Sequence, residues 1–393
     1  MTITVRRLQG EEMLDTLYVQ NQYAFHPSPP FQNKEEWLSF VRGRKGITCY
    51  AAFEADKPLS IAASSAMTQN MRGKLFPASG VWGVATSPTA RRKGYCREVM
   101  GSLLNAEREA GKVFTNLYPF RESFYERMGY VAFPLTKIAH CAPASLAPLL
   151  KMDLEGQLEQ KLISEGFDAY RAYLVQMRQS CHGMSFFDFP DPNAINRNAL
   201  WAGLAMFSGQ LEGVLLYRTQ GEEVGKFNFS AVRFYYQTSR ARYLMLNWIA
   251  RHVDQADRAE LWLPADEYPE TWLADIQVKV ESAIRPAMCR VLDVEKMDGM
   301  QAGEGSFSAR ISDPVCPWNE GNWLFEGHAG VLRVSRATRA DCTLTIQGLS
   351  ALAAGTHAPQ DFPLRGWGEA APELQQIQQG MFPRRCPYMH EMF

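Results

Sequence analysis

Residues 84–96 read VATSPTARRKGYC, and this short segment is the most informative part of the chain. An apolar run passes a proline, becomes a cationic turn at residues 91–93 and closes at Gly94. The segment therefore predicts a strand, a tight basic turn and the N-terminus of a helix that ends near Gly111. The helix is indicated by apolar residues at helical spacing, namely Val99, Met100, Leu103, Leu104 and Ala110.

A junction of this kind is suited to binding phosphate. The first turn of a helix carries unpaired N–H groups and about half a positive charge. Arg91, Arg92 and Lys93 add positive charge, and Gly94 lets the backbone approach a ligand closely. The alternative is a solvated basic helix start, because runs of charge usually lie on the surface.

The order of these parts resembles motif A of the GNAT acetyltransferases. There a splayed strand, the pattern Arg/Gln-x-x-Gly-x-Gly/Ala and a helix hold the pyrophosphate of acetyl-CoA. Arg91 and Gly94 match the first two marked positions, and Cys96 stands where glycine or alanine is usual. The resemblance implies that acetyl-CoA, as co-substrate, contacts Val84, Ala85, Thr86, Arg91, Arg92, Lys93, Gly94, Tyr95 and Cys96.

The next segment resembles the end of motif B of the same family. Residues 114–119, FTNLYP, predict a strand, and residues 124–130, FYERMGY, predict a short helix and a turn into strand 131–133. The resemblance places Tyr125 beside the thioester sulfur and implies that it is the general acid. A tyrosine pKa of about 10 and a thiol pKa of about 8.5 are a fair match for this transfer. A core tyrosine before a turn is the alternative.

Composition narrows the class of protein further. A chain of 393 residues is long enough for two or three domains. Its net charge of −1 offers no bulk field for nucleic acid or an anionic membrane. The N-terminus lacks the apolar segment of a signal peptide, and no apolar run approaches the ~20 residues of a membrane span, so we expect a cytoplasmic protein. The eight cysteines form no Cys-x-x-Cys pair, and no metal is expected.

The first two parts of the chain have similar layouts. Residues 1–145 predict helices at 11–25 and 33–42 and strands at 48–53 and 60–67 before the two motifs, as in one complete GNAT domain. Residues 146–285 predict a helix at 154–180, then strands, a helix at 240–252 and another strand. The corresponding junction at 237–240 lacks the Arg-x-x-Gly turn. This part is therefore predicted to be a second GNAT-like domain without the coenzyme motif.

The last part, residues 286–393, resembles the α+β domain of sterol carrier proteins. It predicts strands at 290–294, 305–313, 330–334 and 343–348, followed by a short helix at 349–355. The fold class is therefore mixed α/β, with two tandem GNAT-like domains and a sterol-carrier-protein-type domain. This three-part order resembles the Eis (enhanced intracellular survival) family of N-acetyltransferases over the whole chain.

The Eis resemblance implies direct acetyl transfer to an amine, with the C-terminal carboxylate of Phe393 as the base. An aromatic last residue fits a buried chain end better than a loose one. A free α-carboxylate has a pKa near about 3.5, so burial must raise this pKa, a water must relay the proton, or the carboxylate positions the amine. His390 and Glu391 are rivals for this role, and an end ordered only for stability is the alternative.

The resemblance also implies an acceptor pocket for cationic amines, such as aminoglycosides, lysine side chains or polyamines. Carboxylates beside aromatic rings suit such ligands. The residues in the matching region are Phe25, Glu35, Glu36, Trp37 and Trp82. A solvated helix face explains the two glutamates equally well, and Trp82 is equally consistent with the core. The family contains hexamers, so a homo-oligomer is expected.

Two other functions remain open from the sequence. One is a non-catalytic regulatory protein that binds acyl-CoA or lipid. The other is a transferase that uses a different acyl donor on the same scaffold. The intact Tyr125 and the aromatic C-terminus favour the acetyltransferase.

Overall fold

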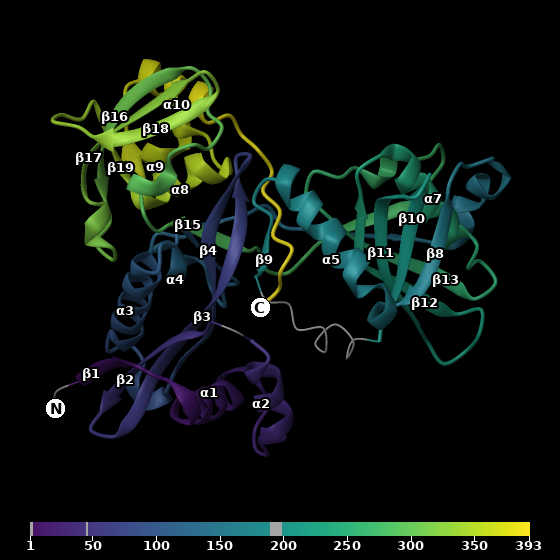
Figure 1. Ribbon diagram of the computed structural model, residues 1–393, viewed down its shortest axis with the longest axis horizontal. Coiled ribbons are helices and arrows are strands. Elements are labelled where there is room, and N and C mark those ends of the chain that lie inside the picture. The colour runs from purple at the N-terminus through teal and green to yellow at the C-terminus, as the bar shows by residue number, and fades with distance from the viewer. Residues whose placement is uncertain (1–2, 45, 189–198) are drawn as a thin grey trace. The chain divides into compact units, whose positions relative to one another are not determined.

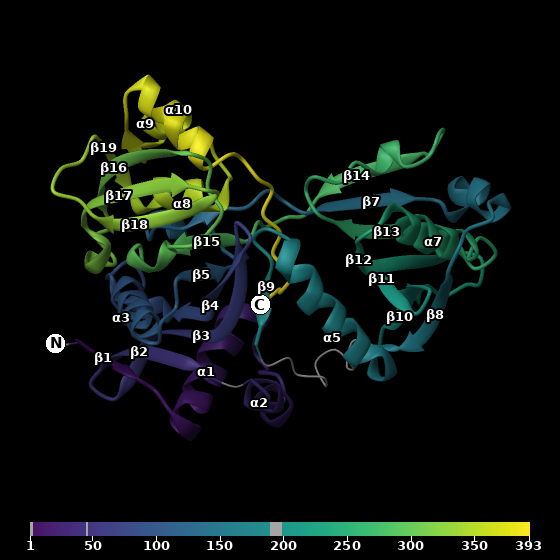
Figure 2. The ribbon, with the colours of Figure 1, turned by 45° about the horizontal axis from the view of Figure 1, so that its top comes forward.

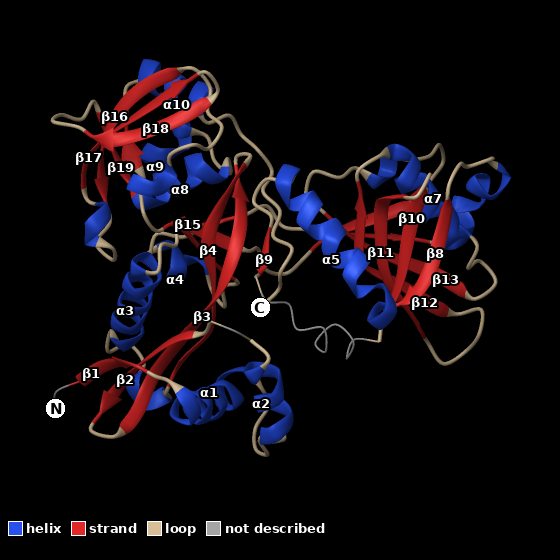
Figure 3. Cartoon of the chain, viewed as in Figure 1, coloured by secondary structure: helices blue, strands red, loops and turns tan. Residues whose placement is uncertain are grey.

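The computed structural model describes residues 3–44, 46–188 and 199–393, apart from the side chain of Phe40. Helices and strands alternate through it, and the predicted mixed α/β class is confirmed (Figure 3). The chain divides into two compact units. Unit 1 consists of Met1–Pro134, Cys181–Pro190 and Arg285–Phe393, and unit 2 consists of Leu135–Ser180 and Asp191–Ile284.

Unit 1 is built on a large mixed sheet (Figure 2). In spatial order, its main strands are β1 (Ile3–Arg7), β2 (Thr48–Glu54), β3 (Lys57–Met71), β4 (Lys74–Thr86), β5 (Phe114–Leu117), β15 (Met288–Val291) and β6 (Val131–Ala132). A further short strand, β9 (Ser185–Phe187), pairs with β3 outside this order.

The helices of this part begin and end close to the predicted residues. They are α1 (Gly10–Phe25), α2 (Lys34–Arg42), α3 (Tyr95–Glu109) and α4 (Glu122–Glu126). The helix α3 follows the basic turn, as its sequence predicts, and its apolar positions Val99, Met100, Leu103 and Leu104 are fully buried. The apolar spacing therefore identifies the face of α3 that covers the sheet.

Strands β4 and β5 are paired over a short distance only. Their parallel ladder covers Ala78–Gly80 and Phe114–Asn116, after which β4 continues to Thr86 beside β3 alone. The β3–β4 ladder also shifts register between Ile61 and Ala63, so that β4 carries a bulge there. The β5 side of residues 81–86 thus lacks a strand partner in the described part of the chain, and we call this stretch the open edge of β4.

A C-terminal domain completes unit 1. Its sheet has the order β18 (Val331–Arg336), β17 (Gly321–His328), β16 (Gly305–Ser312), β19 (Cys342–Thr345) and β20 (Gly368–Glu369). Its helices are α8 (Ile346–Ala354), α9 (Phe362–Arg365) and α10 (Pro372–Met381). One apolar core runs from Phe76 and Phe114 of the first sheet to Phe307 and Trp323 of this domain. Strand β17 and helix α10 were not predicted from the sequence.

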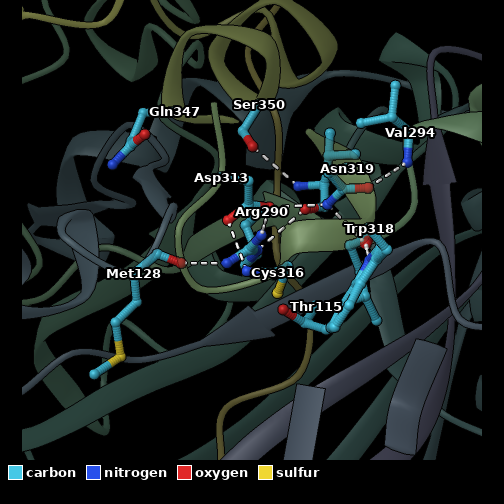
Figure 4. Close-up of polar contacts among 12 residues, drawn as sticks. Thr115, Met128, Arg290, Val294, Asp313, Cys316, Trp318, Asn319, Gln347 and Ser350 are labelled. Atoms are coloured by element: carbon cyan, nitrogen blue, oxygen red, sulfur yellow. Dashed lines mark hydrogen bonds and ion pairs between the residues drawn. The ribbon is translucent and has the colours of Figure 1, made fainter. Parts of the chain in front are cut away.

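A buried ionic network joins β15 to its surroundings (Figure 4). The Arg290 side chain is fully buried and forms an ion pair with Asp313. Its guanidinium also donates to the backbone carbonyls of Val291 and Met128. The amide of Asn319 donates to Asp313 at 2.9 Å and the Cys316 N–H donates to it at 3.1 Å, so this buried carboxylate has three partners. Such a charge pair is tolerated in a core because each charge is paired and hydrogen-bonded.

Unit 2 contains a separate sheet and core. Its strands are, in spatial order, β14 (Val278–Ser282), β7 (Lys137–Cys141), β13 (Ala256–Leu263), β12 (Phe227–Tyr236), β11 (Gln210–Gln220), β10 (Trp201–Phe207) and β8 (Gln157–Leu162). Strand β12, helix α7 (Ser239–Ala250) and the parallel strand β13 repeat the connection made by β4, α3 and β5. This order agrees with the layout predicted from the sequence.

The prediction of one helix over residues 154–180 is wrong in its first part. Residues 157–162 form β8, and only Ile163–Ser180 form a helix, α5. The segment QLEQKL pairs along its whole length with Trp201–Met206 of β10, and this pairing outweighs its helix propensity. Among the described residues, no helix is long and apolar enough to cross a membrane.

Candidate active site

The candidate site begins where β4 and β5 separate. Gly80 and Asn116 form the last residue pair of their ladder, and the open edge of β4 lies beyond it. Val84 and Thr86 are half-buried there, whereas Ala85 is buried. Backbone groups of such an edge are available to an extended ligand in the way that they would be to another strand.

The cationic turn lies between this edge and helix α3. Arg91, Arg92, Lys93 and Gly94 are exposed, and none of the three cations forms an ion pair with another described residue. Gly94 has a φ of 90°, in the left-handed region, and caps α3 without a side-chain hydrogen bond. Unpaired N–H groups, the helix dipole and three free cations therefore make an anion-binding junction.

Tyr125 is buried on α4 within a cluster of aromatic rings. Its ring centroid lies 5.0 Å from that of Phe124, 5.9 Å from Phe120 and 6.1 Å from Tyr130. Burial raises the pKa of Tyr125 above its usual value, and the nearby Cys96 adds to this effect. Burial also raises the pKa of Cys96 to about 11, although a hydrogen bond with Thr86 opposes the shift. Tyr125 thus lies near the first turn of α3 and the end of β4.

The turn that follows Tyr125 is held by the C-terminal domain. The Gln347 side chain donates a hydrogen bond to the Glu126 carbonyl at 2.7 Å, and the Trp367 indole donates to the Glu126 carboxylate at 3.1 Å. Arg290 donates to the Met128 carbonyl (Figure 4). These residues were not predicted from the sequence, because contacts between distant segments leave no local pattern.

The C-terminal tail, residues 383–393, lies along β9. The backbone N–H of Tyr388 donates to the His182 carbonyl at 2.9 Å, and that of Glu391 donates to the Ser185 carbonyl at 3.2 Å. The Glu391 carboxylate in turn accepts a hydrogen bond from the Phe187 N–H at 3.2 Å. These hydrogen bonds hold the tail beside β9 without making it a strand of the sheet.

The ring of Phe393, the last residue, lies at the point where β4 and β5 separate. Its ring lies 5.7 Å from Tyr118, which follows β5, and 5.4 Å from Phe187 of β9. A Cβ atom on Gly80 would come within 2.9 Å of the Phe393 ring, so the absence of a side chain at residue 80 makes room for it. His390 is buried against Phe186 at a ring distance of 5.9 Å.

The predicted acceptor residues divide into two groups. Trp37 and Trp82 both border a small core formed by Leu14, Leu38 and Val41. Trp82 donates to the Ser65 hydroxyl at 3.0 Å, and the Trp37 ring lies 5.6 Å from the Tyr18 ring.

Phe25, Glu35 and Glu36 are exposed and lie outside that core. Glu35 forms an ion pair with Arg42 at 3.4 Å.

Two further residues lie close to the predicted site without having been predicted. Phe120 has 62% of its surface exposed although its ring contacts Phe124 and Tyr125. The Arg44 guanidinium lies 4.7 Å from the Trp82 ring and 5.0 Å from the Phe187 ring. A phenylalanine directly after the strand end at Pro119 was the only sequence signal for the first of them.

Comparison with family models identifies two domains in this chain. Residues 4–133 match the acetyltransferase (GNAT) domain, and residues 294–390 match the sterol carrier protein domain. A comparison with curated protein sequences finds no match. The two matched regions contain motif A, Tyr125 and most of the tail, all described above as parts of unit 1.

Solved structures similar to this one extend over the full chain. A GCN5-related N-acetyltransferase from Anabaena variabilis is 17% identical with a TM-score of 0.83, over 98% of this chain and 99% of its own. A probable N-acyltransferase from Enterococcus faecalis is 18% identical with a TM-score of 0.83, over the whole of both chains. Eis1 from Mycobacterium abscessus is 15% identical with a TM-score of 0.77, again over both whole chains. The protein therefore joins a GNAT acetyltransferase domain, residues 4–133, to a sterol carrier protein domain, residues 294–390, in an Eis-like fold.

Proposed function

We propose that this protein transfers the acetyl group of acetyl-CoA directly to a primary amine. The observation that supports this most strongly is the position of the chain end. The Phe393 ring lies at the point where β4 and β5 separate, in the same compact unit as the cationic turn and Tyr125. This position supports a site in which one unit supplies the proposed donor site, the proposed acid and the chain-terminal carboxylate.

In this proposal, acetyl-CoA occupies the open edge of β4. The pantetheine arm extends along Val84, Ala85 and Thr86, whose backbone groups also polarise the thioester carbonyl. The pyrophosphate binds at the start of α3, where Gly94, Tyr95 and Cys96 supply the helix terminus. Arg91, Arg92 and Lys93 supply positive charge.

The chemical step needs only groups already described. The neutral amine attacks the thioester carbon, a C–N bond forms, and the C–S bond breaks as the tetrahedral intermediate collapses. The Phe393 carboxylate accepts or directs the proton lost by the amine, and the Tyr125 hydroxyl gives its proton to the departing thiolate. The raised pKa of Tyr125 keeps the hydroxyl protonated into alkaline pH but makes donation harder, whereas the positive end of α3 favours the tyrosinate. No step requires a metal.

The acceptor side of the proposal is a cationic amine, of the aminoglycoside, lysine or polyamine type. Trp37 and Trp82 lie together beside one small core and offer aromatic surface. Glu35, Glu36 and Phe25 form the outer part of the proposed acceptor region. The Glu35 carboxylate is partly neutralised by Arg42, so Glu36 is the stronger candidate for an ammonium contact.

The experiment that tests the proposal measures coenzyme A release from acetyl-CoA with a panel of amines. The panel contains aminoglycosides, polyamines, lysine peptides and arylamines, and a second panel replaces acetyl-CoA with longer acyl-CoA donors. Turnover with acetyl-CoA and a cationic amine supports the proposal. Tight acetyl-CoA binding without turnover on any amine would contradict it and favour a regulatory binding protein.

The proposal includes a cytoplasmic homo-oligomer, as the Eis resemblance implies. Light scattering coupled to size-exclusion chromatography measures the mass of the particle in solution. A mass equal to that of one chain, 44.4 kDa, would contradict this part of the proposal without affecting the chemistry.

A further inference from the structure

A cavity of about 340 Å³ lies apart from the open edge of β4, between the β3–β4 hairpin and the C-terminal domain. It is within unit 1 and is lined by Arg72, Gln301, Ala302, Gly303, Gly330, Pro383 and Arg385. Its volume is at the lower end of the range for small-molecule sites. Two of its lining residues are arginines, and none is an aspartate or glutamate.

Arg72 is an unusual residue for this position. It occupies the turn between β3 and β4, and its side chain is fully buried. The guanidinium donates to the carbonyls of Ala353 at 2.9 Å, Leu352 at 2.6 Å and Pro383 at 2.9 Å, but forms no ion pair with a described residue. Its Nη1 atom is buried and has no hydrogen-bond partner in the described part of the chain. A buried cation with an unused donor is costly unless something else satisfies it.

Arg385 brings a second positive charge to the same cavity. Its side chain donates to the Gln301 amide oxygen at 3.2 Å and has no carboxylate partner among the described residues. Burial, and secondarily the charge of Arg385, lower the pKa of Arg72 to about 9. The acidic residue closest in sequence to this lining, Glu304, is bonded instead to the Ala329 N–H at 2.8 Å and lies 3.4 Å from His328.

The cavity therefore has the features of an anion-binding site. We propose that it binds a small phosphate-bearing anion between Arg72 and Arg385. Arg72 has one guanidinium nitrogen, Nη1, left to donate to a phosphate oxygen, and Arg385 adds a second guanidinium charge.

The site also lies at the beginning of the C-terminal tail. Arg72 holds the Pro383 carbonyl, and the Arg385 N–H donates to the Gly355 carbonyl at 3.1 Å. Figure 1 shows the yellow tail leaving the C-terminal domain beside the tip of the β3–β4 hairpin. An anion bound there would reduce the repulsion between the two arginines and hold this end of the tail.

The test titrates the full-length protein with inorganic phosphate and, separately, with glycerol 3-phosphate by calorimetry. Sodium chloride keeps the ionic strength constant, because screening alone changes the apparent affinity. We expect one saturable event that Arg385→Gln weakens at least about tenfold, which is the effect of losing one charge-assisted hydrogen bond. Arg339→Gln removes the same charge from an exposed residue outside the cavity and should leave the event unchanged.

The cationic turn before α3 is a separate phosphate-binding candidate, so Arg91→Gln identifies any event that belongs to it. The proposal fails if the wild-type protein shows no saturable event. It also fails if the events persist unchanged in Arg385→Gln. An event lost only in Arg385→Gln supports it, and the tighter of the two probes shows whether free phosphate or a phosphate ester is preferred.

Discussion

At the scale of single residues, Tyr125 is the most direct test of the chemistry. Replacing it by phenylalanine removes the proposed acid but keeps the ring that packs on Phe124 and Tyr130. We expect Tyr125→Phe to lower kcat by about 10²–10⁴-fold, the usual contribution of a positioned acid. Acetyl-CoA affinity, measured by calorimetry, should change little.

Phe124→Leu is the matched control, because it alters the same aromatic cluster without removing a hydroxyl. A kcat of Tyr125→Phe within a few-fold of the wild-type value would show that thiolate departure needs no acid from this residue.

His182 makes a second prediction at this scale, on stability against pH. Burial lowers its pKa to about 4, the Ala354 carbonyl hydrogen bond opposes this shift, and the charges of Arg72 and Arg385 add to it. In the unfolded chain His182 binds a proton near pH 6.5, whereas in the folded chain it stays neutral at that pH. The free energy of unfolding therefore decreases as pH falls from about 6.5 towards 4.

Between pH 7 and 5.5, the wild-type protein should lose about 1 kcal/mol of unfolding free energy more than His182→Gln does. Urea unfolding at the two pH values measures the difference. His328→Gln, which changes an exposed histidine, should keep the wild-type dependence. Identical pH dependence in the wild type and His182→Gln would mean that His182 is not the group that is buried neutral.

At the scale of elements, the tail tests whether the chain end itself takes part in the reaction. Two residues added after Phe393 would move the carboxylate by up to about 7 Å while leaving the Phe393 ring free to pack on Tyr118 and Phe187. We expect turnover to fall by more than about tenfold and acetyl-CoA binding to persist, because misplacing a reacting group by about 1 Å is already costly.

The same two residues added before Met1 are the control for this extension. Unchanged turnover in the C-terminally extended protein would assign the tail a packing role and remove the carboxylate from the mechanism.

The elements also show what the sequence could and could not predict. Helix α3 and the turn at Gly94 were predictable, because the information lies within one short segment with a clear period. The prediction of a helix over residues 157–162 was wrong, because the pairing of this segment with β10 decides its conformation. The pairing of β15 with β5 and β6, and the contact between Phe393 and Gly80, join segments that are distant in sequence, and no local pattern marks them.

At the scale of the whole molecule, the domain boundaries depend on which segments supply the strands of each sheet. The division proposed from the sequence, 1–145, 146–285 and 286–393, treats the first part as a domain of its own. In the structure, β15 from the last part lies between β5 and β6, and the two regions share one apolar core. We therefore infer that the first and last parts depend on each other for folding.

The last prediction concerns residues 1–145 expressed alone. This fragment lacks β15, and with it the Arg290 and Gln347 contacts to the turn after Tyr125. Core residues such as Phe114 and Val131 would lose buried apolar neighbours, at a cost comparable to the whole stability of a domain. We expect no cooperative unfolding transition and no near-ultraviolet circular dichroism.

Co-expression with residues 285–393 should restore both signals, because the missing strand is then supplied by a second chain. Co-expression with residues 146–284 is the matched control and should restore neither. A fragment 1–145 that unfolds cooperatively by itself would show that the first sheet closes without β15, and would support the three-part division read from the sequence.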